Sequence, residues 1–152
     1  MPDGTAVAWN LGGMDAVTPL YTESVLIAED NQAMRELLAA HFRKAGIAVE
    51  VVETGQQLKR KLKPANGHSW LPKVVVSDIY MPGKTGLEVL RWLHRHFSDV
   101  HVILITAFGD ECTHRRAKKL GAVAVLDKPF ALDELLTLVA ELLQQDQQQS
   151  EA

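Results

Sequence analysis

The stretch VVVSD at 74–78 decides the fold, because a buried-type apolar run ends there in a single carboxylate. Four similar short runs lie elsewhere in the chain, at Val25–Ala28, Val49–Val52, Val102–Ile105 and Val123–Leu126. Runs that are apolar almost throughout are typical of strands covered on both faces, as in parallel sheets. We therefore predict five buried strands, the third at Val74–Ser77 with Asp78 directly after it.

Longer amphipathic stretches separate these runs. Their apolar residues recur at spacings of three and four, which predicts helices at Gln32–Ala45, Gln56–Leu62, Leu87–His96, Glu111–Leu120 and Leu132–Gln144. Gly46 and Gly121 stand where helix C-terminal caps belong. Repeated strand and helix units predict an α/β domain with a parallel sheet. Pro64–Pro72 is expected to be a long surface loop.

Composition excludes several classes of protein. The chain has 152 residues, of which 47% are apolar and 23% charged, as expected for one globular domain. The formal charge of -3 and the lack of a dense Lys/Arg stripe argue against direct nucleic-acid binding. No apolar run is long enough for membrane insertion. The single cysteine, Cys112, cannot form an internal disulfide, which fits a cytoplasmic protein.

The ends of the chain differ in composition from its middle. We predict a flexible leader at 1–22, a folded domain at 23–144 and a polar tail at 145–152. We expect no DNA-binding or catalytic domain after the last helix. The chain is therefore either a single-domain protein or the front of a longer one.

Polar residues follow four of the predicted strands. They are Glu29 and Asp30 after the first, Asp78 after the third, Thr106 at the end of the fourth and Lys128 after the fifth. Ligands of parallel α/β sheets collect at this edge. Crowded carboxylates repel one another unless a cation intervenes, and oxygen ligands favour Mg²⁺. Taken alone, the acidic pair after the first strand could equally cap the first helix.

Four stretches resemble the receiver domains of two-component response regulators. They are LIAEDN at 26–31, VSDIYMPGKTG at 76–86, LITA at 104–107 and GAVAVLDKPF at 121–130. The likeness extends over residues 24–143. It implies a flavodoxin-like, doubly wound (βα)5 fold whose strand order is 2-1-3-4-5.

The resemblance also implies a phosphorylation site. Asp78 would attack the phosphorus of a phosphohistidine and become an aspartyl phosphate. Thr106 and Lys128 would contact the phosphoryl oxygens, with Lys128 aimed by a cis bond to Pro129. Such a domain catalyses only its own phosphorylation and dephosphorylation, so we expect a switch rather than a conventional enzyme.

The same resemblance implies a magnesium site. Asp30 and Asp78 would bind Mg²⁺ directly, and Glu29 would bind it through water or at longer reach. The backbone carbonyl of Tyr80 would complete the protein ligands. A phosphatase of the haloacid dehalogenase type also uses Asp and Mg²⁺, but it usually has a second Asp where this chain has Tyr80. A flavin-binding or phosphorylation-independent domain would not need this set of residues.

Partner surfaces follow from the resemblance as well. Asn31, Met34, Leu37 and Phe130 are candidates for contact with a histidine kinase or a phosphotransfer protein, although Leu37 is as consistent with core packing. The downstream partner is an unknown protein.

Three residues near the expected site bear on how the domain would signal. Val125 stands where receivers commonly carry a switching aromatic, so we expect the output to depend on Ala107–Asp110 and the helix after it. Tyr80 and Phe108 are bulky and lie near the expected site, where they would shield a phosphoryl group from water.

Overall fold

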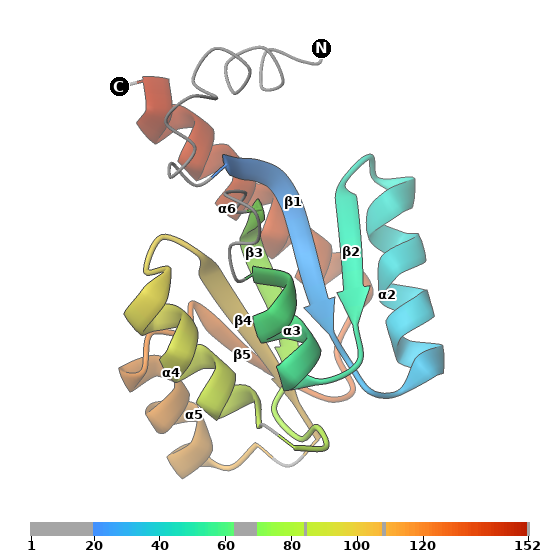
Figure 1. Cartoon of the computed structure of the whole chain (residues 1–152). Helices are drawn as coiled ribbons and strands as arrows, with labels where there is room; N and C mark the ends of the chain where they lie inside the picture. The colour runs from blue at the N-terminus through green and yellow to red at the C-terminus, as the bar shows by residue number, and fades with distance from the viewer. Residues whose placement is uncertain (1–19, 63–69, 84, 108, 152) are drawn as a thin grey trace.

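The computed structural model describes residues 20–62, 70–83, 85–107 and 109–151, and these form one parallel sheet flanked by helices (Figure 1). The strands are β1 (Leu20–Ala28), β2 (Ala48–Val52), β3 (Trp70–Asp78), β4 (His101–Thr106) and β5 (Ala124–Asp127). Their order is β2-β1-β3-β4-β5, with every pairing parallel. The predicted flavodoxin-like α/β fold and its strand order are confirmed.

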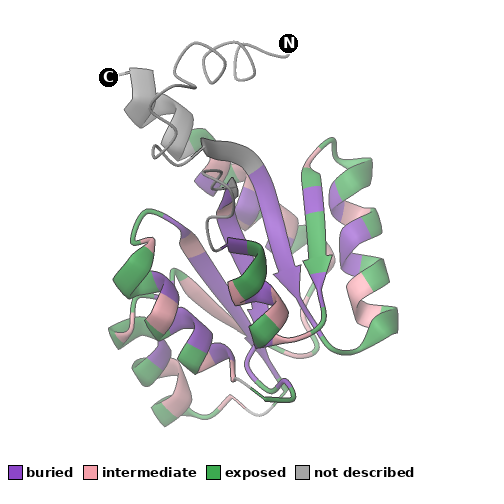
Figure 2. Ribbon diagram, viewed as in Figure 1, coloured by how far each residue is buried: buried purple, intermediate pink, exposed green. Residues whose placement is uncertain are grey.

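Helices cover both faces of the sheet. α2 (Gln32–Lys44) and α6 (Leu132–Glu151) pack on one face, and α3 (Gly55–Leu62), α4 (Gly86–His96) and α5 (Glu111–Lys119) pack on the other. Alternate residues of one strand serve the two faces: Val25 and Ile27 face α2 and α6, whereas Leu26 faces the other helices. Buried residues therefore run through the central strands in Figure 2.

Both predicted glycine caps are confirmed. Gly46 follows α2 with φ of 85°, and Gly121 follows the end of α5 with φ of 110°. Their N–H groups donate to the carbonyls of Arg43 and Lys118, which would otherwise be left unpaired at the helix ends.

The first and third strands begin earlier than predicted, and the long loop therefore ends earlier. β1 already begins at Leu20, and Leu20–Thr22 pairs with Trp70–Pro72 of β3. Pro72 was predicted to lie in the loop, and proline cannot donate a hydrogen bond to a strand ladder. Here β4 starts to pair with β3 only at Val74, so at Pro72 the strand has a single neighbour. The rest of that loop, at 63–69, is outside the described residues.

The predicted end of the last helix at Gln144 is also wrong, because α6 continues to Glu151. The glutamine-rich end of this helix lacks the apolar periodicity by which its first part was predicted. Glutamine nevertheless has a good intrinsic helix propensity. Neither this 20-residue helix nor any other helix in the described ranges is apolar enough over a sufficient length to cross a membrane.

Candidate functional site

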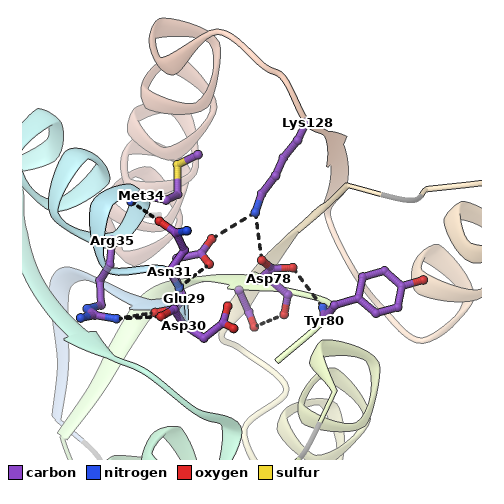
Figure 3. Close-up of polar contacts among 9 residues, drawn as sticks. Glu29, Asp30, Asn31, Met34, Arg35, Asp78, Tyr80 and Lys128 are labelled. Carbon is purple, nitrogen blue, oxygen red and sulfur yellow. Dashed lines mark hydrogen bonds and ion pairs between the residues drawn. The ribbon is translucent and has the colours of Figure 1, made fainter. Parts of the chain in front are cut away.

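The carboxyl ends of four strands bring the predicted site residues together. Glu29 and Asp30 follow β1, Asp78 ends β3, Thr106 ends β4 and Lys128 follows β5. One carboxylate oxygen from each of the three acidic residues lies within 4.8 Å of the others. Figure 3 shows these side chains meeting at the edge of the sheet. Parallel pairing accounts for this convergence, because all five strands end on the same side.

Lys128 bridges two of the carboxylates. Its Nζ donates to Asp78 Oδ2 at 3.0 Å and to Glu29 Oε1 at 3.4 Å (Figure 3). Burial alone would lower the pKa of Lys128, but the hydrogen bond and charge of Asp78, together with those of Glu29, raise it above its ordinary value. Lys128 therefore stays protonated. The bond to Pro129 is cis, as predicted.

Asp78 is buried and held at both carboxylate oxygens. Oδ2 accepts from Lys128, and Oδ1 accepts from the backbone N–H of Tyr80 at 3.0 Å. The short turn after β3 makes the second contact possible. Gly83 has φ of 81°, and the N–H of Gly86 donates to the carbonyl of Ile79 at 2.7 Å. These contacts fix the direction in which the Asp78 carboxylate faces.

Glu29 is a buried carboxylate with an altered proton affinity. Burial raises its pKa, and the hydrogen bond from the Asn31 N–H to Oε2, at 3.1 Å, lowers it. Asp78 raises the pKa further and Lys128 opposes that effect, so that the pKa lies at about 7. A carboxylate in this condition is stabilised by an additional cation.

The three carboxylates fit a hard divalent ion. Glu29 and Asp78 are buried, whereas Asp30 is exposed, so an ion at this edge would keep access to solvent. Mg²⁺ is typically bound by one or two carboxylates while it retains several waters. The donor chemistry and the raised pKa of Glu29 both suit such an ion.

The capping alternative for Glu29 and Asp30 is wrong. Asn31 is the N-cap of α2, and its Oδ1 accepts from the Met34 N–H at 2.9 Å. Neither acidic residue lies in the first turn of that helix. Both are therefore left for the site rather than for the helix end.

Arg35 is a residue of the site that the sequence did not predict. Its Nη1 donates to the backbone carbonyl of Glu29 at 2.9 Å and to that of Asp30 at 3.4 Å, and it lies 3.7 Å from Glu53 Oε1. It thereby holds the acidic turn against α2 (Figure 3). No motif marks this role, because an arginine that binds backbone carbonyls depends on turn geometry.

Three of the four predicted partner residues line one groove beside the site. Met34 and Leu37 of α2 and Phe130 border a hollow of about 340 Å³, together with Lys128, Pro129 and Leu132. Leu37 is 51% exposed, so the alternative that it packs in the core is wrong. Asn31 is exposed at the start of the same helix.

The remaining predictions around Asp78 concern the switch and the shielding groups. Thr106 is fully buried, and Val125 packs partly buried against the face that carries α3, α4 and α5. Tyr80 is 50% exposed, and its ring points away from Asp78 (Figure 3). Phe108 lies outside the described residues, so shielding of Asp78 by this pair stays a prediction.

Several curated proteins are similar to this chain in sequence. One is the C4-dicarboxylate transport transcriptional regulatory protein DctD of Pseudomonas aeruginosa, which is 40% identical over 79% of this chain and 25% of its own length. Response regulator RR06 of Streptococcus pneumoniae is 32% identical over 79% of this chain and 52% of its own length. The chain thus spans a quarter to about half of these curated relatives.

Solved structures agree with the fold. The receiver domain of the Francisella response regulator 1452 matches with a TM-score of 0.73 and 26% identity, over 82% of this chain and 99% of that one. The signal receiver domain of a Luxo repressor protein from Vibrio parahaemolyticus matches with a TM-score of 0.75 and 25% identity, over 84% and 95%. The family model described as the response regulator receiver domain matches residues 25–140. With the acidic edge and its lysine in place, the chain belongs to the response regulator receiver domain family.

Proposed function

We propose that this chain is a phosphorylation-activated switch whose phosphoacceptor is Asp78. A carboxylate oxygen of Asp78 attacks the phosphorus of a phosphohistidine, and the new O–P bond forms as the N–P bond breaks. The departing imidazole keeps the electron pair of that bond and takes up a proton. The observation that carries the proposal is the orientation of Asp78 by Lys128 at Oδ2 and by the Tyr80 N–H at Oδ1.

The neighbouring groups stabilise the transferring phosphoryl group. Lys128 balances charge on one phosphoryl oxygen, and the Thr106 hydroxyl donates to another. Asp30, Asp78 and the Tyr80 carbonyl would hold Mg²⁺ directly, and Glu29 would hold it through water or at longer reach. The ion would supply positive charge to offset that of the phosphoryl oxygens. The close approach of three carboxylates supports this ligand set.

The groove lined by Met34, Leu37 and Phe130 is the docking surface for the phosphodonor. An exposed leucine beside the phosphoacceptor suits an apolar helix of a histidine kinase or phosphotransfer protein. The message then passes to a downstream protein through altered contacts. With no external substrate to turn over, the domain works as a switch.

Labelling with acetyl phosphate tests the chemistry. In MgCl₂ the native chain should gain an acid-stable, hydroxylamine-labile phosphate, seen as a slower band on a phosphate-affinity gel and as added mass. Asp78→Asn should not be labelled, while Asp99→Asn, an exposed matched control, should behave as native. Equal labelling of Asp78→Asn and the native chain would contradict the proposal.

Transfer from a phosphorylated histidine kinase tests the docking surface. Leu37→Asp should lower the ratio of kinase-dependent to acetyl phosphate-dependent labelling by about tenfold, because a buried contact is replaced by a charge. Val51→Asp, at another exposed apolar position, is the control. An unchanged ratio in Leu37→Asp would place the docking surface elsewhere.

A further inference from the structure

A second groove lies between α4 and α5, on the opposite face of the sheet from α2 and α6. It encloses about 410 Å³, and its lining includes Ile79, Leu87 and Leu120 as apolar wall, Tyr80 at its rim, and Arg91 and Arg116. The groove with Met34 and Leu37 shares none of these residues. It is therefore a separate surface.

The two arginines give this groove an excess of positive charge. Among the described residues, neither the Arg91 nor the Arg116 guanidinium group has a hydrogen-bond or ion-pair partner, and both residues are exposed. Glu88 also lines the groove, but its Oε1 accepts from the Thr85 N–H at 3.2 Å in the capping box of α4. The carboxylate is thus used at the helix end, and the guanidinium groups are available to an anion.

We propose that this groove binds a segment of a partner protein that carries a carboxylate next to an apolar side chain. Planar guanidinium groups bind carboxylates in a bidentate manner, and Arg91 and Arg116 stand on the two helices that border the hollow. Leu87 and Leu120 offer apolar surface for the adjoining side chain. Tyrosine and arginine are the residue types enriched where binding energy concentrates, and Tyr80 is half exposed here.

Charge and shape favour a protein segment over the other anionic ligands. Nucleic acid is bound through many phosphate contacts, whereas this groove offers two arginines in a chain with a formal charge of -3. A free inorganic anion would leave the apolar wall uncovered. An acidic and apolar peptide fills both parts of the groove.

Short peptides are suitable probes of this surface. A set of acetylated and amidated peptides would carry one Glu and one Leu at varied spacing among Gly and Ser, with matched peptides in which Gln replaces Glu. In NMR titrations, at least one Glu peptide should shift the Arg91 and Arg116 Nε–H signals and the Leu87 and Leu120 methyls. The Arg91→Gln/Arg116→Gln double variant should bind that peptide about tenfold more weakly.

A matched variant separates local binding from general electrostatics. Arg95→Gln/Arg115→Gln changes the same two helices by the same charge at exposed positions outside the groove, and should bind as the native chain does. Equal weakening in both double variants, equal binding of the Gln peptides, or equally tight binding of acetate alone would overturn the proposal. The absence of any shift at Arg91 and Arg116 would overturn it too. Peptide binding should persist in Asp78→Asn, so that a failure of phosphotransfer and a failure of this proposal are distinguishable.

Discussion

At the scale of single residues, Glu29 makes the stability of the folded chain depend on pH. Burial, above all, raises the pKa of Glu29 from its ordinary value of 4.5 to about 7 in the folded chain. The folded state therefore holds a proton that the unfolded state has released, and this contribution to stability is fully present below pH 4.5 and lost as pH rises through about 7. Lys128 opposes this loss without removing it.

We predict that, in the presence of a chelator, the free energy of unfolding falls between pH 5 and 8, roughly, as Glu29 ionises. Glu29→Gln should flatten this part of the profile, because it removes the titrating group. Urea unfolding across the range measures the difference. The control is Glu36→Gln, which removes the same charge from a carboxylate that is exposed on α2. Identical slopes in Glu29→Gln and Glu36→Gln would reject the prediction.

Lys128 should affect metal binding and phosphoryl transfer in opposite directions. Its ammonium lies 3.0 Å from Asp78 Oδ2, where it competes with a cation for the carboxylate. Lys128→Gln should therefore bind Mg²⁺ several-fold more tightly above the pKa of Glu29, yet take phosphate from acetyl phosphate about a hundredfold more slowly. Calorimetry and labelling rates measure the two effects, with Lys119→Gln as an exposed control. Weaker Mg²⁺ binding would contradict the competition.

The charged and polar residues of the site could be predicted from the sequence, because parallel strands bring their carboxyl ends to one edge of the sheet. Asp78 and Lys128 could thus be predicted to lie close together, although 50 positions separate them in the sequence. Arg35 could not be predicted, since it acts on backbone carbonyls whose direction is set by the turn. Arg91 and Arg116 were missed for a similar reason: their shared groove depends on how two helices pack.

At the scale of elements, the turn from β3 into α4 leaves no room for a side chain at Gly86. A Cβ there would lie 2.5 Å from the Asp78 carbonyl oxygen and 2.8 Å from Ile79 Cα. Both neighbours are backbone atoms of the segment that carries Asp78. The turn therefore transmits any change at Gly86 directly to Asp78.

We predict that Gly86→Ala costs about 2 kcal/mol of stability and weakens Mg²⁺ binding, because the backbone at Asp78 must move to accept the methyl group. Urea unfolding and calorimetry measure the two effects. Gly46→Ala is the contrast: its φ is 85°, but nothing lies within 4 Å of the added Cβ. Its cost should be limited to about 1 kcal/mol of backbone strain, with Mg²⁺ affinity unchanged. Equal Mg²⁺ affinities in the two variants would contradict the role given to this turn.

The elements themselves were largely predictable, and their ends less so. The start of β3 was missed because Pro72 normally breaks a ladder, and here only β1 pairs at that level. The end of α6 was missed because its glutamines have helix propensity without apolar periodicity. The apolar pattern of the sequence identifies the buried residues of a helix or strand. The element can extend beyond these residues, so its ends are predicted less well.

At the scale of the whole molecule, the helices are unequally anchored. Ala117 is the only buried residue of α5, whereas four residues of α4 are buried. The segment before α5 is tightly packed at Gly109: a Cβ there would clash with Asp127 Oδ1 and lie 2.6 Å from Thr106 Cγ2 and 2.8 Å from His114 Nε2. We therefore expect a movement of Thr106 to reach α5 through Gly109, whatever the packing of Val125.

We predict that beryllofluoride with Mg²⁺ changes hydrogen exchange at Gly109, Asp110 and α5 more than in α2 or α6, because weakly anchored elements open at least cost. Exchange measured by mass spectrometry on peptides from each helix tests this. Asp78→Asn should show no such response. Unchanged exchange throughout α5 in the native chain, or a response confined to β5 around Val125, would contradict this route of output.

The direction of α6 has a practical consequence. β1 starts at Leu20 and α6 ends at Glu151 at the same edge of the sheet, opposite to the edge that holds Asp78 (Figure 1). A fluorophore or surface tether joined at Glu151 thus leaves the acidic edge and both grooves facing the solution. A chain immobilised in this orientation should exchange phosphodonors and peptides as freely as one in solution, which makes it suitable for single-molecule recordings of the switch.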